Sequence, residues 1–101
     1  MMPYSLRRTR DGAGDSGQMS DAITPIFDEN QKLIDKIIEN NARPKVGAAM
    51  MVGSGYARSY SGQDWWMTTP ITEILEDRTE EDGTEYVRFK TGNSEYEWRA
   101  F

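Results

Sequence analysis

The hydrophobic positions of the chain change their spacing at Pro44. Between Thr24 and Asn41 the apolar residues recur at three- and four-residue steps, with charged residues mostly between them. This spacing is typical of an amphipathic helix, with Thr24 as its N-cap and Pro25 in its first turn. Pro44 cannot continue such a helix. The pattern therefore predicts an amphipathic helix over residues 21–43, with a large apolar stripe for its length.

The second half of the chain has the two-residue period of β-strands. Two dipeptides that favour tight hairpin turns, Asp82-Gly83 and Gly92-Asn93, separate the last three alternating segments. A long connection separates the first segment from the others. Four or five short antiparallel strands with a long first loop predict a small SH3-like barrel. The alternating segments are residues 46–52, 70–78, 84–91 and 94–101.

Together these patterns predict an α+β fold in three parts. Residues 1–20 are rich in Gly, Ser and Asp and lack periodicity, so we expect a flexible, disordered N-terminal tail. The helix would follow over residues 21–43, and a small antiparallel SH3-like β-barrel or curved sheet of four to five strands over 44–101. We expect the core to contain Ile34, Ile37, Ile38, Val52, Ile71, Ile74, Leu75, Val87, Phe89 and at least one of Trp65 and Trp66.

The composition narrows the possible functions. The 101 residues include no cysteine and no histidine, which excludes disulfide scaffolds, thiol catalysis, Cys/His zinc sites and imidazole mechanisms. No paired-carboxylate or metal-loop spacing stands out either. We therefore expect no enzyme activity, no catalytic residue, no metal and no cofactor. Because no apolar run approaches the length of a membrane span or of a signal peptide, we expect a cytoplasmic protein without membrane contact.

The charge is distributed unevenly. The net charge is −5, yet the first ten residues carry Arg7, Arg8 and Arg10 and no acid, so the rest of the chain is strongly acidic. A negative surface repels phosphate backbones, which disfavours a nucleic-acid partner except through these three arginines. The acidic run at residues 76–85 is most simply a solvated hairpin tip. Alternatively, it imitates a phosphate backbone.

Residues 57–70, ARSYSGQDWWMTTP, place two adjacent tryptophans in a connecting segment. One interpretation is structural: one tryptophan fills the end of the barrel and the other lies under the helix. The other interpretation is recognition, because aromatic faces, a forked arginine and hydroxyls are the usual composition of a binding surface. The candidate binding residues are Arg58, Ser59, Tyr60, Asp64, Trp65, Trp66, Thr68 and, from the last hairpin turn, Asn93.

The segment VGAAMMVGSGYARSYSGQDWWMTTPITEILED, followed by YVRFKTGNSEYEWR, resembles small uncharacterised proteins of tailed bacteriophages. The pattern is an ARSYS-x-x-D-W-W loop, a TTPITEI strand and a closing F-K-T-x-N-S-x-Y-E-W hairpin, within residues 46–99. The resemblance implies a compact phage-encoded protein, acting in the cytoplasm of a host cell, and implies no particular chemistry.

Two functions of different class fit these observations. We expect a non-catalytic binding protein that inhibits a host nucleic-acid enzyme or defence effector by protein docking. The alternative is a small-molecule binder that sequesters a nucleotide-like ligand in a pocket of Arg58, Tyr60 and Trp66. We also expect a homodimer with twofold symmetry, because the apolar helix is too large for a small barrel to cover.

Overall fold

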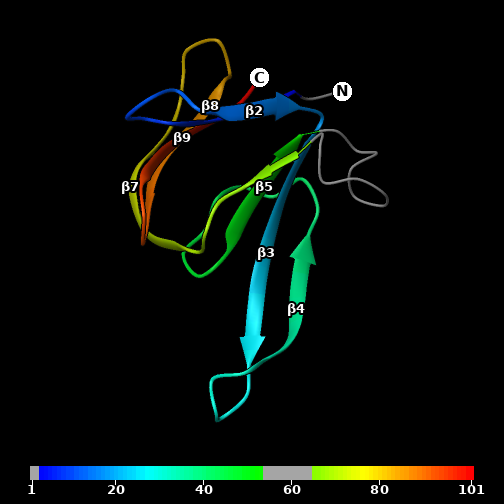
Figure 1. Cartoon of the computed structure of the whole chain (residues 1–101). Helices are drawn as coiled ribbons and strands as arrows, with labels where there is room; N and C mark the ends of the chain where they lie inside the picture. The colour runs from blue at the N-terminus through cyan, green and yellow to red at the C-terminus, as the bar shows by residue number, and fades with distance from the viewer. Residues whose placement is uncertain (1–2, 54–64) are drawn as a thin grey trace.

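The computed structural model describes residues 3–53 and 65–101. In these two ranges the chain contains no helix and folds into two antiparallel β-sheets (Figure 1). The predicted α+β class is therefore wrong, and the described part of the protein is all-β. Its strands are β1 (Tyr4–Arg8), β2 (Gly14–Gly17), β3 (Met19–Phe27), β4 (Leu33–Glu39), β5 (Ala49–Gly53), β6 (Trp65–Met67), β7 (Ile71–Thr79), β8 (Glu85–Thr91) and β9 (Glu95–Ala100).

The strands form two sheets that do not close into a barrel, which corrects the predicted SH3-like barrel. One sheet has the order β2-β1-β9-β8-β7 and the other the order β4-β3-β5-β6. The core lies where β5 and the first part of β3 pack against the inner face of the five-stranded sheet. Its largest fully buried side chains include Trp98, Phe89 and Leu6. The expected burial of Val52, Ile71, Val87 and Phe89 is confirmed, whereas Ile74 and Leu75 are half-buried.

The segment predicted as a disordered tail contains β1 and β2. Tyr4 and Leu6 alternate into the core, and β1 pairs with β9 at the other end of the sequence. Two glycines of this segment, Gly14 and Gly17, allow close backbone contacts. A Cβ at Gly17 would lie 2.2 Å from the carbonyl oxygen of Gly53. The composition of this segment suggested flexibility because the partner strand of β1 lies at the far end of the sequence, and no local pattern of residues indicates such a pairing.

The predicted helix is an antiparallel β-hairpin of β3 and β4. Ile23 pairs with Ile38 and Thr24 with Ile37, and a turn at Asp28–Lys32 joins the strands. Pro25 is tolerated in β3 because one edge of this strand is unpaired at the proline. β4 occupies one edge of β3, and β5 pairs along the other edge only at Met19–Ile23. No backbone N–H is therefore required on the open edge at residue 25. We call the part of this hairpin beyond residue 23 the arm (residues 24–38).

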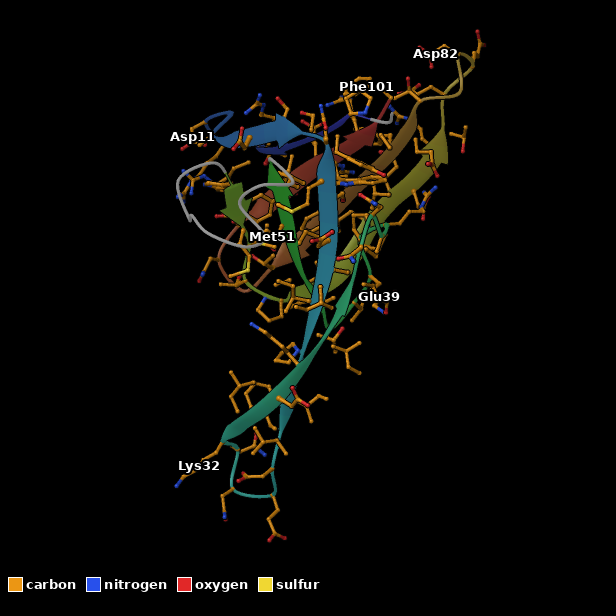
Figure 2. All side chains as sticks on the ribbon, turned by 90° about the vertical axis from the view of Figure 1, so that its right-hand side faces the viewer. Asp11, Lys32, Glu39, Met51, Asp82 and Phe101 are labelled. Atoms are coloured by element: carbon orange, nitrogen blue, oxygen red, sulfur yellow. The ribbon has the colours of Figure 1, made fainter. Side chains whose placement is uncertain are left out.

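The arm extends away from the two-sheet body (Figures 1 and 2), and the longest dimension of the molecule is 46 Å. The expected burial of Ile34, Ile37 and Ile38 is therefore wrong, since these side chains are 63%, 51% and 49% exposed. The physical reason is that β5 covers only the base of β3, and no other described strand reaches the arm.

Candidate functional site: the β3–β4 arm

The structure describes only part of the predicted tryptophan site. Arg58, Ser59, Tyr60 and Asp64 lie outside the described residues, so their role in binding stays a prediction. Trp65 begins β6, where its backbone pairs with that of Gly53.

Trp66 and Thr68 have structural contacts. Trp66 pairs with Val52, is half-buried against the core, and meets the ring of Tyr96 edge-on at 5.5 Å between centroids. Thr68 is buried; its Oγ1 accepts a hydrogen bond from the Met50 N–H at 3.0 Å and donates one to the Thr69 carbonyl at 2.7 Å. Both side chains therefore fix β6 to the core.

Asn93 lies exposed in the β8–β9 turn, as the hairpin signal predicted. Its backbone N–H donates to the Thr91 hydroxyl at 3.2 Å, and the Ser94 N–H donates to the same oxygen at 3.3 Å. These bonds hold the turn.

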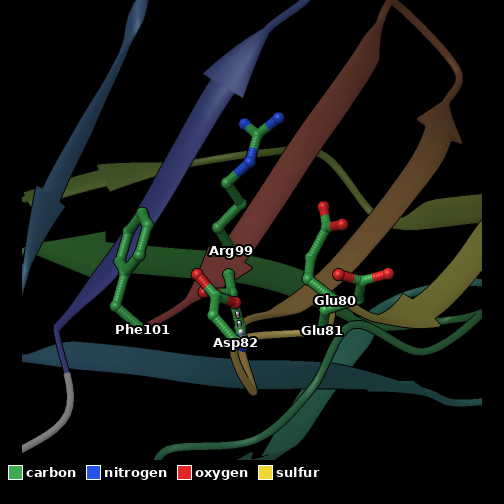
Figure 3. A pocket seen from close by; sticks show the side chains of 6 residues that line it. Glu80, Glu81, Asp82, Arg99 and Phe101 are labelled. Carbon is green, nitrogen blue, oxygen red and sulfur yellow. Dashed lines mark hydrogen bonds between the residues drawn. The ribbon is translucent and has the colours of Figure 1, made fainter.

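The acidic β7–β8 turn borders an open hollow lined by Glu80, Glu81, Asp82, Thr84, Arg99 and Phe101 (Figure 3). The Thr84 N–H donates to the Asp82 carboxylate at 2.9 Å, which lowers the pKa of that carboxyl. Arg78 pairs with Glu76 and Glu80. Local partners thus offset much of the negative charge, and no group of carboxylates suited to a metal ion occurs in residues 3–53 and 65–101.

The largest unexplained feature is the apolar surface of the arm. Every residue of β4 is exposed, and apolar residues are as exposed as charged ones. Soluble proteins rarely expose a contiguous apolar patch that is not a site of interaction. The large side chains of the arm that are about half exposed or more are Phe27 (52%), Leu33 (62%), Ile34 (63%), Ile37 (51%) and Ile38 (49%).

Both faces of the arm carry this surface. Residues that pair directly across two strands share a face, and successive residues alternate between faces. One face therefore holds Ile23, Ile38 and Lys36, and we call it the lysine face. The other holds Ile26, Ile37 and Asp35, and we call it the aspartate face. Figure 2 shows side chains standing out on both sides of the ribbon.

The edge of β4 is less suited to binding than the faces. β4 is the outer strand of its sheet, so one row of its backbone groups is available to another strand. However, the Asp35 carboxylate accepts a hydrogen bond from the Lys36 N–H at 2.8 Å, and a bulge interrupts the register at Ile34. Charged residues and bulges are the devices that protect edge strands against added strands. The faces of the arm are therefore more open to contact than the edge of β4.

Sequence reasoning found these apolar residues but assigned them the wrong geometry. The signal for the arm was the doublets Ile26-Phe27, Leu33-Ile34 and Ile37-Ile38. Two adjacent apolar residues point to opposite faces of a strand, so repeated doublets indicate a ribbon that is apolar on both sides.

Comparison with protein-family models, with curated proteins and with solved structures finds no match to this chain. In the described part, no helix is long and apolar enough to cross a membrane. Function is therefore inferred from the geometry of the arm and the body.

Proposed function

We propose that this protein is a non-catalytic docking protein whose arm binds a protein partner. The observation that carries the proposal is the near-equal exposure of Ile37 and Ile38, neighbours on opposite faces of β4. Because apolar side chains stabilise a fold only through the surface that leaves water, about half of what Ile37 and Ile38 could contribute is not used in the monomer.

The energetics of burial are of the right size for docking. The five exposed side chains of the arm present on the order of 400 Å² of apolar surface, worth about 10 kcal/mol at about 25 cal/mol per Å². Association costs roughly 4–15 kcal/mol in lost freedom of motion. Burying the arm can therefore sustain a complex when further contacts of the body add to it.

Inhibition of a host nucleic-acid enzyme or defence effector is a finer hypothesis within this proposal. The resemblance to small phage proteins supports it, as does the net charge of −5, which complements the basic surfaces of enzymes that bind nucleic acid. The absence of cysteine suits a reducing cytoplasm. No described residue favours the nucleotide-binding alternative, because Arg58 and Tyr60 lie outside the described ranges and Trp66 packs against the core.

Site-specific photo-crosslinking tests the docking proposal. The photoreactive residue p-benzoylphenylalanine replaces Ile34 in the arm, and in a control variant it replaces Glu81 in the exposed β7–β8 turn. We expect discrete protein adducts from position 34, either with the purified protein or after mixing with extract of the cells that produce it, and none from position 81. If position 34 gives no more adducts than position 81 under both conditions, the arm is not a docking element.

A further inference from the structure

We propose that the partner of the arm is another copy of this chain, and that copies assemble head to tail into a closed ring of three or more subunits. The lysine face of one arm would lie against the aspartate face of the next. This inference rests on the proposed function, and it replaces the twofold dimer expected from the sequence.

The first argument is symmetry. A twofold contact brings the same face of both copies together, so it would cover one face of each arm and leave the other in water. In the arm, Ile38 on the lysine face and Ile37 on the aspartate face are about equally exposed. Burial of either side chain would therefore stabilise a complex to a similar extent. A head-to-tail contact places one face of each copy on the opposite face of its neighbour. Only this arrangement covers both faces with identical contacts.

The second argument is charge. Lys36 lies on one face and Asp35 on the other. Contact between like faces would bring two Lys36 side chains, or two Asp35 side chains, close together near the symmetry axis. Contact between unlike faces instead brings Lys36 of one arm to Asp35 of the next. Opposed charges across an interface favour the correct partner, and like charges reject the wrong one.

The edge of β4 argues against a continuous sheet of two arms. An antiparallel twofold pairing centred on Lys36 would place lysine opposite lysine, and one centred on Asp35 would place aspartate opposite aspartate; like charges directly opposite destabilise a strand pair. The Lys36 N–H is moreover already bonded to the Asp35 carboxylate. Face-to-face packing is therefore favoured over edge-to-edge pairing.

The third argument concerns closure. Packed β-ribbons lie about 10 Å apart, whereas even the smallest dimension of the molecule is 24 Å. Neighbouring arms can approach this closely only if their wider bodies splay apart. Each subunit is then rotated relative to the last, so the arms gather near an axis and the bodies lie outside them. Repeated rotation of this kind closes into a ring when it carries no translation along the axis, and otherwise it gives a helical filament of unlimited mass.

The test is the mass in solution of the wild-type chain and three charge variants, measured by light scattering over a range of concentrations. We expect the wild type to have a defined mass of at least three times 11.6 kDa. The Lys36→Asp and Asp35→Lys variants should each raise the concentration of half-dissociation about tenfold or more, because each leaves like charges across the contact. The double variant should restore assembly, since it exchanges the two faces. Lys90→Asp, at the one exposed position of β8, makes the same charge change away from the arm and should have no effect.

Other outcomes overturn the ring. A dimer, or a series of masses without limit, would contradict the closed head-to-tail contact, whatever the variants do. A monomer at all concentrations whose position 34 crosslinks to a different protein would overturn the ring and leave the docking proposal intact. A monomer without such crosslinks would overturn both. Failure of the double variant to reassemble, with the wild type in a ring, would contradict the assigned pairing of faces.

Discussion

At the scale of single residues, Trp98 organises the junction of the two sheets. The side chain is 1% exposed; its Nε1 donates to the Ser20 Oγ at 2.8 Å, and its ring stacks on that of Tyr4. The Ser20 hydroxyl in turn donates to the Ala42 carbonyl at 3.1 Å. In the described residues no buried side-chain nitrogen or oxygen lacks a hydrogen-bond partner. These hydrogen bonds matter because a buried polar group without a partner destabilises the fold by more free energy than one hydrogen bond contributes.

Replacing Ser20 tests this bond. The Ser20→Ala variant leaves the buried Trp98 N–H without its acceptor, which should lower the free energy of unfolding by about 1–3 kcal/mol. Urea denaturation followed by tryptophan fluorescence measures the change. Ser16→Ala, at the one exposed position of β2, is the matched control and should change stability by less than about 0.5 kcal/mol. Equal stability of the two variants would show that the indole N–H finds another acceptor.

Tyr86 gives a prediction about pH. Its phenol is buried between the guanidinium groups of Arg78 and Arg99 on the outer face of the five-stranded sheet, and it donates to the Glu97 carboxylate at 2.6 Å. Burial, followed by the bond to Glu97, raises the pKa of Tyr86 to about 12. The native state therefore holds this proton more tightly than the unfolded state, whose tyrosines ionise near pH 10.

The pH dependence of the stability follows from this difference in pKa. The contribution of Tyr86 to stability is complete below about pH 10 and is lost as the pH rises from about 10 to 12. Unfolding measured across this range should show a steeper loss of stability for the wild type than for Tyr86→Phe. Glu97→Gln should give an intermediate slope, because burial alone then raises the pKa. Identical slopes for the wild type and Tyr86→Phe would contradict the assignment.

At the scale of elements, the arm and β2 show how much a strand depends on its neighbours. The isoleucine doublets occur at a spacing that satisfies a helix stripe and a two-sided ribbon equally well. Their β-branched side chains favour the strand. β2 lies so close to β5 at Gly17 that a side chain there would meet the backbone of Gly53.

The contact of β2 with β5 gives a prediction. A methyl group at Gly17 would meet the backbone of Gly53, which cannot rotate away as a side chain could. We therefore expect Gly17→Ala to lower the free energy of unfolding by about 1–3 kcal/mol, as overpacking does. Gly92→Ala is the control, because a Cβ there has open space and the backbone has no positive φ. Should the two variants unfold at the same urea concentration, the two strands are farther apart in solution than in this structure.

At the scale of the whole molecule, Arg43 ties the two sheets together. It follows the arm in the chain, yet its guanidinium pairs with Asp77 of β7 and Glu85 of β8 and lies 5.8 Å from the ring centroid of Trp98. The planar fork of an arginine holds two carboxylates in a fixed geometry, whereas a lysine offers a single point charge on a flexible stem. One side chain thus closes the end of the core beside the arm.

Removal of the Arg43 side chain should lower the stability of the packed sheets. Arg43→Ala removes the guanidinium over the Trp98 ring and leaves Asp77 and Glu85 without their common cation, so we expect the free energy of unfolding to fall by about 1 kcal/mol. A larger loss is not expected because the ion pairs are partly exposed. Arg43→Lys should recover only part of it. Arg10→Ala, in an exposed position, should change nothing measurable. Thermal unfolding of the three variants makes the comparison, and an unchanged wild-type midpoint in Arg43→Ala would show that the link contributes nothing.

The elements with local signals can be predicted from the amino-acid pattern alone. Alternation and the Asp82-Gly83 turn located β7, β8 and β9, and alternation with small residues located β5. β7, β8 and β9 pair with their sequence neighbours through short turns, so the two-residue period and the turn chemistry suffice for them. β5 is found by its alternation alone, because it pairs with β3 and β6 across longer stretches of sequence. The lack of cysteine and histidine likewise limits the chemistry whatever the fold.

The first half of the chain takes its conformation from contacts between distant segments. β1 is a strand because β9, some ninety positions away, offers it an edge, and no local pattern can announce such a partner. The doublets of the arm fit a helix or a ribbon until the pairing of Ile23 with Ile38 selects the ribbon. Burial is decided at the same level. Val52 and Ile37 look alike in the sequence, and they differ because the five-stranded sheet covers β5 and nothing in the described body covers the arm.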